Sequence, residues 1–316
     1  MQPFTFLALL VYANSALAAV IFPNITDIRD VPYTPISPRD ATALSADAFA
    51  AIIPFANFAC AAYCPSDTVA TWECGAPCSA LPGFEVTLTG GDGAGTQLFY
   101  VGYWPEKSAV VVAHQGTDPK KLIADLTDLN LFMQGFNNTL FPGMTSGAEG
   151  HGGFLEQYSS TTSTISSEVN RLISSKGATS VIATGHSLGG ALAELDSLSY
   201  SLTLPSSIQV KGVTFGTPRV GNGQYAAFFD SHVSDFQRIN NMKDPVPIIP
   251  GRFLGFSHVR GEIHIVDAES AVACSGDDDD FDDSCTIKTV PNIFESAVGD
   301  HSGPYNGVMI GSSCCV

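Results

Sequence analysis

The segment ATGHSLGGALAE, from Ala183 to Glu194, constrains the fold more than any other part of the chain. It contains the pattern Gly-x-Ser-x-Gly, with Gly185 and Gly189 on either side of Ser187. The β-branched run SVIAT precedes the pattern and the helix-forming run ALAEL follows it, so a strand must turn abruptly into a helix at the serine. Side chains two residues away on either side would collide in such a turn. The pattern therefore predicts a sharp strand–serine–helix elbow.

The predicted elbow gives Ser187 a reactive environment. A serine at a helix N-terminus faces unpaired backbone N–H groups and the positive end of the helix dipole, and both favour negative charge on a reacting oxygen. The N–H of Leu188 is then one donor of an oxyanion hole, and His186 occupies the elbow just before the serine. We expect Ser187 to be the nucleophile of an acyl-transfer reaction.

A serine hydroxyl needs a base to take its proton, and that base must be held by a third group. With this kind of elbow the chain order is serine, carboxylate, histidine. Asp244 is the favoured carboxylate, because INNMKDPVPIIPG places it just after a predicted strand in a loop fixed by prolines, although an Asp there also forms turns. His301, in the late polar loop GDHSGPY, is the favoured base. His258 is the remaining candidate, and His264 fits a structural strand position.

The second oxyanion donor is expected on a loop that follows an earlier strand. The segment AVVVAHQGTDPKK supplies a predicted strand and then a loop that reaches Gly116 and Thr117. Thr117 offers both a backbone N–H and a hydroxyl group. We therefore expect Thr117 and Leu188 to form the oxyanion hole together.

Segments rich in β-branched and aromatic residues, bounded by Gly, Pro or Asp, predict the strands. They are EVTLTG from Glu85, QLFYVGYW from Gln97, AVVVAH from Ala109, SVIATG from Ser180, VKGVTFG from Val210 and EIHIVDA from Glu262. Apolar residues at helical spacing between Leu155 and Ile173, and the run ALAELDSLSYSL, predict helices between and after them. Strands that alternate with helices predict a central, mostly parallel sheet with helices on both faces. With the elbow, this arrangement is the α/β-hydrolase fold.

The chain begins with the apolar run MQPFTFLALLVYANSALA, which ends in small residues at Ala16 and Ala18. This pattern predicts a signal peptide over residues 1–18, with a buried N-terminal helix as the alternative, and the run is too short for a good membrane span. Residues 19–316 are expected to form a single domain that is secreted to the extracellular space. The formal net charge of −17 argues against a nucleic-acid partner.

An even number of cysteines in an exported chain predicts disulfides, with zinc ligation as the alternative. The cysteines are Cys60, Cys64, Cys74, Cys78, Cys274, Cys285, Cys314 and Cys315. Sequons at Asn24 and Asn137 would accept glycans along a eukaryotic secretory route. The acidic segment from Ser275 to Ser284 predicts a solvated loop without the residue spacing of a calcium site. No metal or other cofactor is expected.

Several motifs together resemble the fungal class 3 lipases, a family that includes zygomycete lipases and fungal feruloyl esterases. The most specific are GHSLGGA, TFGTPRVGN, KDPVPIIP, FSHVRGEIH and the late DH, and the similarity runs from AAYC to the final cysteines. The resemblance implies the α/β-hydrolase fold and the same triad and oxyanion hole, namely Ser187, Asp244 and His301 with Thr117 and Leu188.

The resemblance also implies a lid over the segment DPKKLIADL, in which Asp125 matches a carboxylate that steadies the oxyanion threonine. Leu122, Ile123 and Leu126 can supply the apolar face of such a lid, although a fixed helix packed over the sheet is the alternative. Family members commonly carry Phe-Arg-Gly before the oxyanion residue, whereas this chain carries the sequence HQG from His114. The implied disulfides join Cys274 with Cys285, Cys74 with Cys78, and Cys60 and Cys64 with Cys314 and Cys315 in either order.

These expectations describe a secreted carboxylic ester hydrolase, a triacylglycerol lipase that forms an acyl-enzyme on Ser187 and takes lipid esters at an oil–water interface. A feruloyl esterase or phospholipase of the same family is the alternative within this reaction class, and a peptidase is a further one. From a different class, a non-catalytic lipid carrier would use the same scaffold.

Overall fold

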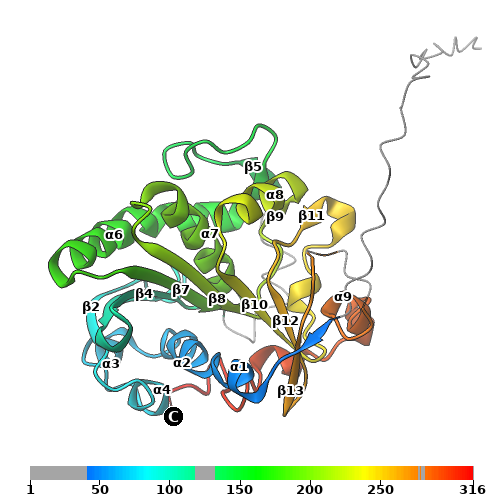
Figure 1. The fold of residues 1–316 in the computed structure, drawn as a ribbon, viewed down its shortest axis with the longest axis horizontal. Helices are drawn as coiled ribbons and strands as arrows, with labels where there is room; N and C mark the ends of the chain where they lie inside the picture. The colour runs from blue at the N-terminus through cyan, green and yellow to red at the C-terminus, as the bar shows by residue number, and fades with distance from the viewer. Residues whose placement is uncertain (1–40, 118–131, 277, 279–281, 316) are drawn as a thin grey trace, which may run out of the picture. The chain divides into compact units, whose positions relative to one another are not determined.

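The central sheet of the computed structural model has a parallel middle and antiparallel edges (Figure 1). Its strands, in spatial order, are β1 (Thr42–Ala43), β13 (Ser270–Ala273), β12 (Glu262–Asp267), β10 (Phe236–Asn241), β8 (Gln209–Phe215), β7 (Ser180–His186), β4 (Ala109–His114), β3 (Phe99–Trp104) and β2 (Glu85–Gly90). The neighbours from β12 to β4 pair in parallel, and the outer pairs are antiparallel. Every strand predicted from the sequence lies in this sheet.

The structure describes residues 41–117, 132–276, 278 and 282–315. The predicted signal peptide, Asn24 and the predicted lid with Asp125 therefore lie outside the described residues. All of these described residues belong to one compact unit. None of the helices in the described ranges combines the length and apolarity that a bilayer span needs.

Helices cover the sheet on both faces (Figure 1). One layer contains α1 (Ala46–Ala50), α2 (Ile53–Ala61), α3 (Ser66–Ala70) and α4 (Ala76–Ser79), and the other face is covered by α6 (Gly152–Lys176) and α7 (Leu188–Thr203). Outside these layers are α8 (Gly223–His232), α9 (Thr286–Thr289) and the short 3-10 turns η1 (Pro105–Lys107), η2 (Val246–Ile248), η3 (Arg252–Leu254), η4 (Ile293–Glu295) and η5 (Val298–Ser302). A small second sheet, which the sequence did not predict, pairs β11 (Phe256–Ser257), β9 (Gly221–Asn222), β6 (Glu149–His151) and β5 (Met133–Gly135).

The alternation of side chains along β4 shows why two helical layers are needed. Ala109, Val111 and Ala113 join the apolar cluster under α2, whereas Val110 and Val112 join the cluster under α6. A strand that is apolar on both faces exposes a costly surface unless each face is covered, because a fully buried Val contributes about 1.5–3 kcal/mol. The continuous run AVVV is therefore explained by burial on both sides.

The two long helices bury different amounts of their surface. In α6 the buried residues recur at helical spacing, and the helix ends at Gly177, which adopts a left-handed conformation with φ 66°. In α7 every residue from Leu188 to Tyr200 is buried, because the helix lies among the sheet, α6 and α8. This central helix begins at the residue after Ser187, so the elbow continues directly into the buried part of this helix.

Each of the eight cysteines lies in one of four disulfides. They join Cys60 with Cys314, Cys64 with Cys315, Cys74 with Cys78, and Cys274 with Cys285. The first two settle the order that the sequence left open.

Among the described residues of the acidic segment from Ser275 to Ser284, Asp278 departs from the prediction of a solvated loop. Asp278 is buried, and its carboxylate forms two hydrogen bonds with the guanidinium of Arg219, Nε to Oδ2 at 2.5 Å and Nη2 to Oδ1 at 3.1 Å. A carboxylate can leave water at low cost when a cation with matching bidentate geometry replaces the solvent. The prediction considered only the repulsion within the acidic run and missed this distant cation.

Candidate active site

The elbow has the backbone geometry that the glycine pattern predicts. Strand β7 ends at His186, α7 begins at Leu188, and Ser187 between them has φ 60° and ψ −128°. A side-chain Cβ on Gly185 would lie 2.2 Å from the carbonyl oxygen of Gly189, and one on Gly189 would lie 2.2 Å from the carbonyl oxygen of His114. Only glycine fits at either position, which explains the motif in steric terms.

Ser187 is held by its backbone and leaves its hydroxyl available. Its N–H donates to the carbonyl of Phe215 at 2.9 Å, which ties the elbow to the end of β8. Its Oγ is buried and has no hydrogen-bond partner among the described residues. Leu188 is the first residue of α7, so its N–H has no acceptor within the helix.

Asp244 and His301 meet as a buried pair. The Nδ1 of His301 lies 2.8 Å from Oδ2 of Asp244, while Oδ1 of Asp244 accepts the N–H of Val246 at 2.8 Å. The other ring nitrogen, Nε2 of His301, has no hydrogen-bond partner within the described ranges. Gly216 lies against this pair, since a Cβ there would be 2.7 Å from Oδ2 of Asp244 and 2.8 Å from Nδ1 of His301. Because Gly216 follows Phe215, the pair is adjacent to the elbow.

Two loops that are far apart in sequence are joined around this pair. The carboxylate of Asp300 accepts the backbone N–H of Lys243 at 2.9 Å, and the side-chain amide of Asn241 donates to the carbonyl of Asp300 at 2.8 Å. The N–H of Ala297 donates to the carbonyl of Lys243 at 2.8 Å. These bonds hold the loop after β10 against the loop that carries His301, so the carboxylate and the imidazole stay in reach across 57 positions of sequence.

The predicted oxyanion loop passes directly beside the serine. A Cβ on Gly116 would lie 2.9 Å from Cβ of Ser187 and 2.4 Å from the carbonyl oxygen of His186. Thr117, the next residue, is buried. The structure thus brings Thr117, Leu188 and Ser187 into one region, together with Asp244 and His301.

The position where the family usually has phenylalanine is used differently in this chain. The Nε2 of His114 lies 2.7 Å from Oδ2 of Asp196, a fully buried residue of α7. The side-chain carbonyl of the following residue, Gln115, accepts the N–H of Leu98 at 3.1 Å. The end of β4 is therefore tied by polar contacts to α7 and to Leu98, the residue before β3, just ahead of the predicted oxyanion loop.

The other histidines considered from the sequence lie in structural roles. The ring nitrogens of His264 lie 2.5 Å and 2.8 Å from the carbonyl oxygens of Ser284 and Met242, and Nε2 of His258 lies 2.7 Å from that of Pro247. Burial holds the pKa of His258 well below its usual value, and the positive charge of Arg238 adds to this effect. Among the described residues, neither ring is hydrogen-bonded to a carboxylate, in contrast to His301.

Sequence reasoning missed three residues of the site, namely Tyr63, Gly216 and Tyr305. The hydroxyl of Tyr63 lies 2.7 Å from Nδ1 of His186, and that of Tyr305 donates to the carbonyl of His301 at 2.9 Å. The available signal was their place in or beside the motifs AAYC, TFGTPRVGN and GDHSGPY.

Comparisons with known proteins agree with this geometry. The sequence model of the family described as "Lipase (class 3)" matches residues 111–254. A secreted mono- and diacylglycerol lipase of Malassezia globosa is 32% identical over 183 residues, which cover 58% of this chain and 60% of that protein. A lipase of Rhizopus niveus is 33% identical over 152 residues, which cover 47% of this chain and 39% of that protein. The chain thus spans about 60% of the length of the Malassezia relative it matches.

Solved structures match over a larger part of the chain. Lipase II from Rhizopus niveus superimposes with a TM-score of 0.75 at 24% identity, covering 87% of this chain and 100% of the other. A triacylglycerol lipase whose catalytic centre is described as a serine protease triad gives a TM-score of 0.75 at 25% identity, with the same coverage of both chains. Together with the elbow, these similarities show that this chain has the α/β-hydrolase fold and that it is similar to the class 3 lipases over residues 111–254.

Proposed function

We propose that this chain is a carboxylic ester hydrolase of the lipase type, which forms an acyl-enzyme on Ser187. The observation that carries the proposal is the pairing of His301 with Asp244 beside a strained serine. The hydroxyl of this serine and Nε2 of His301 are both buried, and neither has a hydrogen-bond partner among the residues that the structure describes. Unsatisfied buried polar atoms are costly in a folded protein, so two of them at one site indicate a function.

In the proposed reaction Nε2 of His301 takes the proton of Ser187 as Oγ attacks the ester carbonyl. Asp244 orients the imidazole and stabilises its cationic form. The N–H groups of Leu188 and Thr117 stabilise the negative oxygen of the tetrahedral intermediate, and Asp125 is proposed to steady Thr117. His301 then gives its proton to the departing alcohol, and water repeats the attack on the acyl-enzyme. Each proton and leaving group is accounted for without a cofactor.

Acylglycerols are the proposed substrates, with triacylglycerol as the first choice. The named relatives include mono- and diacylglycerol lipases and a triacylglycerol lipase, which supports a glyceride ester. Large apolar side chains are exposed in loops before β5 and before β11, with Phe132 at 79% and Phe253 at 89% of their full exposure. Such residues are suited to an apolar surface, and a net charge of −17 favours a neutral oil over an anionic membrane.

Secretion and glycosylation belong to the same proposal. Relatives named as secreted lipases support export of this chain, with cleavage after residue 18. Asn137 is exposed in the structure, as a glycan acceptor must be, and its Oδ1 accepts the N–H of Thr139 at 2.8 Å. Asn24 is the second proposed glycan site.

The test compares wild-type protein with Ser187→Ala on emulsified mono-, di- and triacylglycerols and on methyl ferulate. The wild-type protein should release fatty acid from at least one glyceride, and Ser187→Ala should lose nearly all turnover while its unfolding midpoint stays within a few degrees. Faster turnover of methyl ferulate than of any glyceride would favour the feruloyl esterase instead. Wild-type protein that acquires no adduct from a fluorophosphonate probe would instead be the non-catalytic lipid carrier.

A further inference from the structure

A chain of hydrogen bonds leads from the N-terminal helical layer to the backbone of His301. The hydroxyl of Tyr63 lies 2.7 Å from Nδ1 of His186, and Nε2 of His186 lies 2.7 Å from the carbonyl oxygen of His301. The rings of His186 and His301 lie 4.3 Å apart between their centroids. His186 is fully buried, and neither the acyl-transfer steps nor the oxyanion hole uses its side chain.

The direction of each hydrogen bond follows from the acceptor at the end of the chain. A backbone carbonyl can only accept, so Nε2 of His186 must carry the proton. Burial, together with the neighbouring His301, holds the pKa of His186 well below its usual value, so the ring stays neutral and Nδ1 has no proton. Nδ1 therefore accepts, and the hydroxyl of Tyr63 donates to it. The His301 carbonyl thus fixes the tautomer of His186, and the hydroxyl of Tyr63 helps to fix the orientation of its ring.

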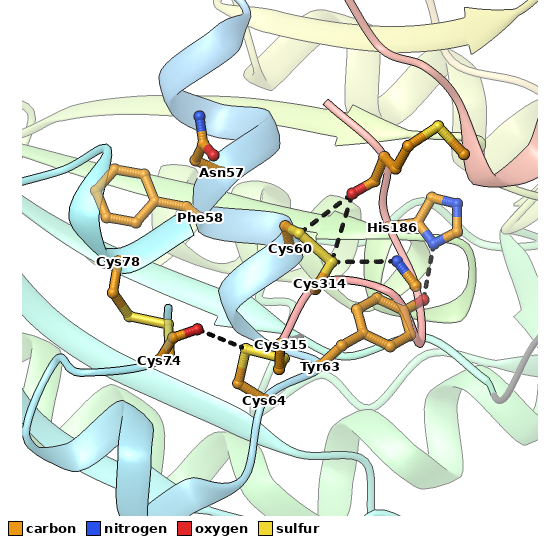
Figure 2. Close-up of a disulfide and its surroundings, with 12 residues drawn as sticks. Asn57, Phe58, Cys60, Tyr63, Cys64, Cys74, Cys78, His186, Cys314 and Cys315 are labelled. Carbon is orange, nitrogen blue, oxygen red and sulfur yellow. Dashed lines mark hydrogen bonds between the residues drawn. A yellow bond between two sulfur atoms is a disulfide. The ribbon is translucent and has the colours of Figure 1, made fainter. Parts of the chain in front are cut away.

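Two disulfides hold Tyr63 in place from both sides (Figure 2). Cys60, three residues earlier, is bonded to Cys314, and Cys64, the next residue, is bonded to Cys315. Figure 2 shows the tyrosine ring beside these bridges, with its hydroxyl directed at His186. Cys314 and Cys315 lie in the C-terminal segment that follows the loop of His301. This segment is tied to that loop, because the N–H of Ile310 donates to the carbonyl of Ser302 at 2.8 Å.

We propose that Tyr63 is a positioning residue that sets the place of His301 through His186, and that the Cys60–Cys314 bridge holds Tyr63 in register for this role. The inference rests on the proposed function, in which His301 is the base. Losing the Tyr63 hydroxyl leaves Nδ1 of His186 buried without a donor, so the ring is free to turn and its bond to the His301 carbonyl loosens. The imidazole then spends less time in line with Ser187.

An alternative role for Tyr63 is contact with the substrate. A Cβ on Gly116 would lie 2.5 Å from the Tyr63 hydroxyl and 2.9 Å from Cβ of Ser187, so the hydroxyl lies close to the oxyanion loop. The two roles separate in kinetics. A positioning residue changes kcat and leaves KM, whereas a residue that binds substrate equally in ground and transition states changes KM.

The test measures kcat and KM on a soluble p-nitrophenyl ester for Tyr63→Phe, His186→Gln and the double variant. Glutamine keeps an N–H that can donate to the His301 carbonyl but lacks the Nδ1 acceptor. We expect Tyr63→Phe to lower kcat about three- to tenfold with KM unchanged within about twofold, as the loss of one hydrogen bond implies. In the His186→Gln background, Tyr63→Phe should have no further effect. Additive losses, or a change confined to KM, would overturn the proposal.

Two further variants separate positioning from general damage. Tyr225→Phe removes another buried hydroxyl, which donates to Glu194 at 3.0 Å in the layer on the other face, and should leave kcat unchanged. The double variant Cys60→Ser with Cys314→Ser should lower kcat about as much as Tyr63→Phe, and the two changes together should not add. Its unfolding midpoint should move little, because the Cys64–Cys315 bridge still closes a loop of nearly the same length, 251 against 254 residues.

Fluorophosphonate labelling distinguishes a failure of the proposed function from a failure of the positioning role of Tyr63. Absence of an adduct on Ser187 in the wild-type protein would refute the proposed function and this inference with it. Labelling of the wild-type protein, with unchanged labelling rates and kcat in Tyr63→Phe, would refute only the positioning role of Tyr63.

Discussion

Two buried carboxylates in this protein have different kinds of partner. Asp244 faces the imidazole of His301, whereas Asp278 faces the permanently charged guanidinium of Arg219. Both carboxylates are almost completely removed from solvent, at 1% and 7% exposure. Asp278 also accepts the backbone N–H of His258 at 3.0 Å, and Arg219 donates to the carbonyls of Ile248 and Pro250.

Under the proposed function, Asp244 and His301 are a reacting pair, whereas Asp278 and Arg219 are a structural pair. In the proposed reaction the positive charge at the Asp244 site forms when His301 takes the proton of Ser187, so the full attraction arises at that step. At the Asp278 site the attraction is always present, and it joins three loops near the end of the sheet. We therefore expect changes at the first site to cost rate and changes at the second to cost stability.

The largest expected effect comes from Asp244→Asn. The amide keeps the shape of the carboxylate but loses its charge, and it can present an N–H toward Nδ1 that favours the wrong tautomer of His301. We expect kcat on a p-nitrophenyl ester to fall by about 10³–10⁴-fold, with a much smaller change in the free energy of unfolding. Turnover within tenfold of the wild-type value would show that Asp244 is not the partner that matters. Asp235→Asn, at an exposed carboxylate paired with Lys211 outside the site, is the control and should leave kcat unchanged.

The next largest effect is on stability and comes from Arg219→Met. Removing one partner leaves the carboxylate of Asp278 buried and unpaired, which costs about 3–5 kcal/mol of unfolding free energy. Turnover per fluorophosphonate-labelled molecule should stay within about twofold of wild type. Adding Asp278→Leu should recover much of the stability, because an apolar pair needs no compensating charge. A large loss of kcat in the folded Arg219→Met protein would erase the distinction between the two sites.

Acid should weaken the structural pair in a defined direction. Burial alone would raise the pKa of Asp278, but His258 and the Arg219 guanidinium together carry it below its ordinary value. A carboxylate whose pKa is lower in the folded state stabilises the fold above its unfolded pKa of about 3.9, and this stability is lost as the pH falls through the folded pKa. In urea unfolding, the gap between wild type and Arg219→Met should be largest near pH 7 and shrink as the pH falls, because burial without Arg219 raises the pKa of the Asp278 carboxyl in the variant and acid neutralises that unpaired charge first. An equal gap at pH 7 and pH 3 would contradict this linkage.

The two sites also differ in how far they could be predicted from the sequence. The elbow was predictable because its strand, serine and helix are contiguous, and the steric reason for Gly185 and Gly189 is local. Asp244 and His301 were predictable because the chain order of such sites and the loop composition limit the candidates. The predicted lid and Asp125 lie outside the described residues and remain predictions.

The pairing of Asp278 with Arg219 was not predictable from the acidic run, because it joins residues 59 positions apart. The order of the C-terminal bridges was open for a similar reason, since Cys314 and Cys315 are adjacent and either can reach Cys60 by sequence alone. Both features depend on how loops from different strands are brought together. Arg219 lies in the motif TFGTPRVGN, which marks it as a residue of interest, but the motif does not indicate that its ion-pair partner is Asp278.

The smallest expected effect sharpens the reacting side of the comparison. The hydroxyl of Tyr305 and Nε2 of His186 both lie within hydrogen-bond distance of the carbonyl of His301, at 2.9 Å and 2.7 Å. Tyr305→Phe removes one of two donors, so the carbonyl stays satisfied and the unfolding free energy should fall by only about 0.5–1.5 kcal/mol. We expect kcat to fall by no more than about threefold, less than for Tyr63→Phe, which leaves a buried ring nitrogen without its donor. If Tyr305→Phe proved the more damaging of the two in parallel kinetic assays, the position of His301 would depend on the C-terminal loop itself rather than on His186.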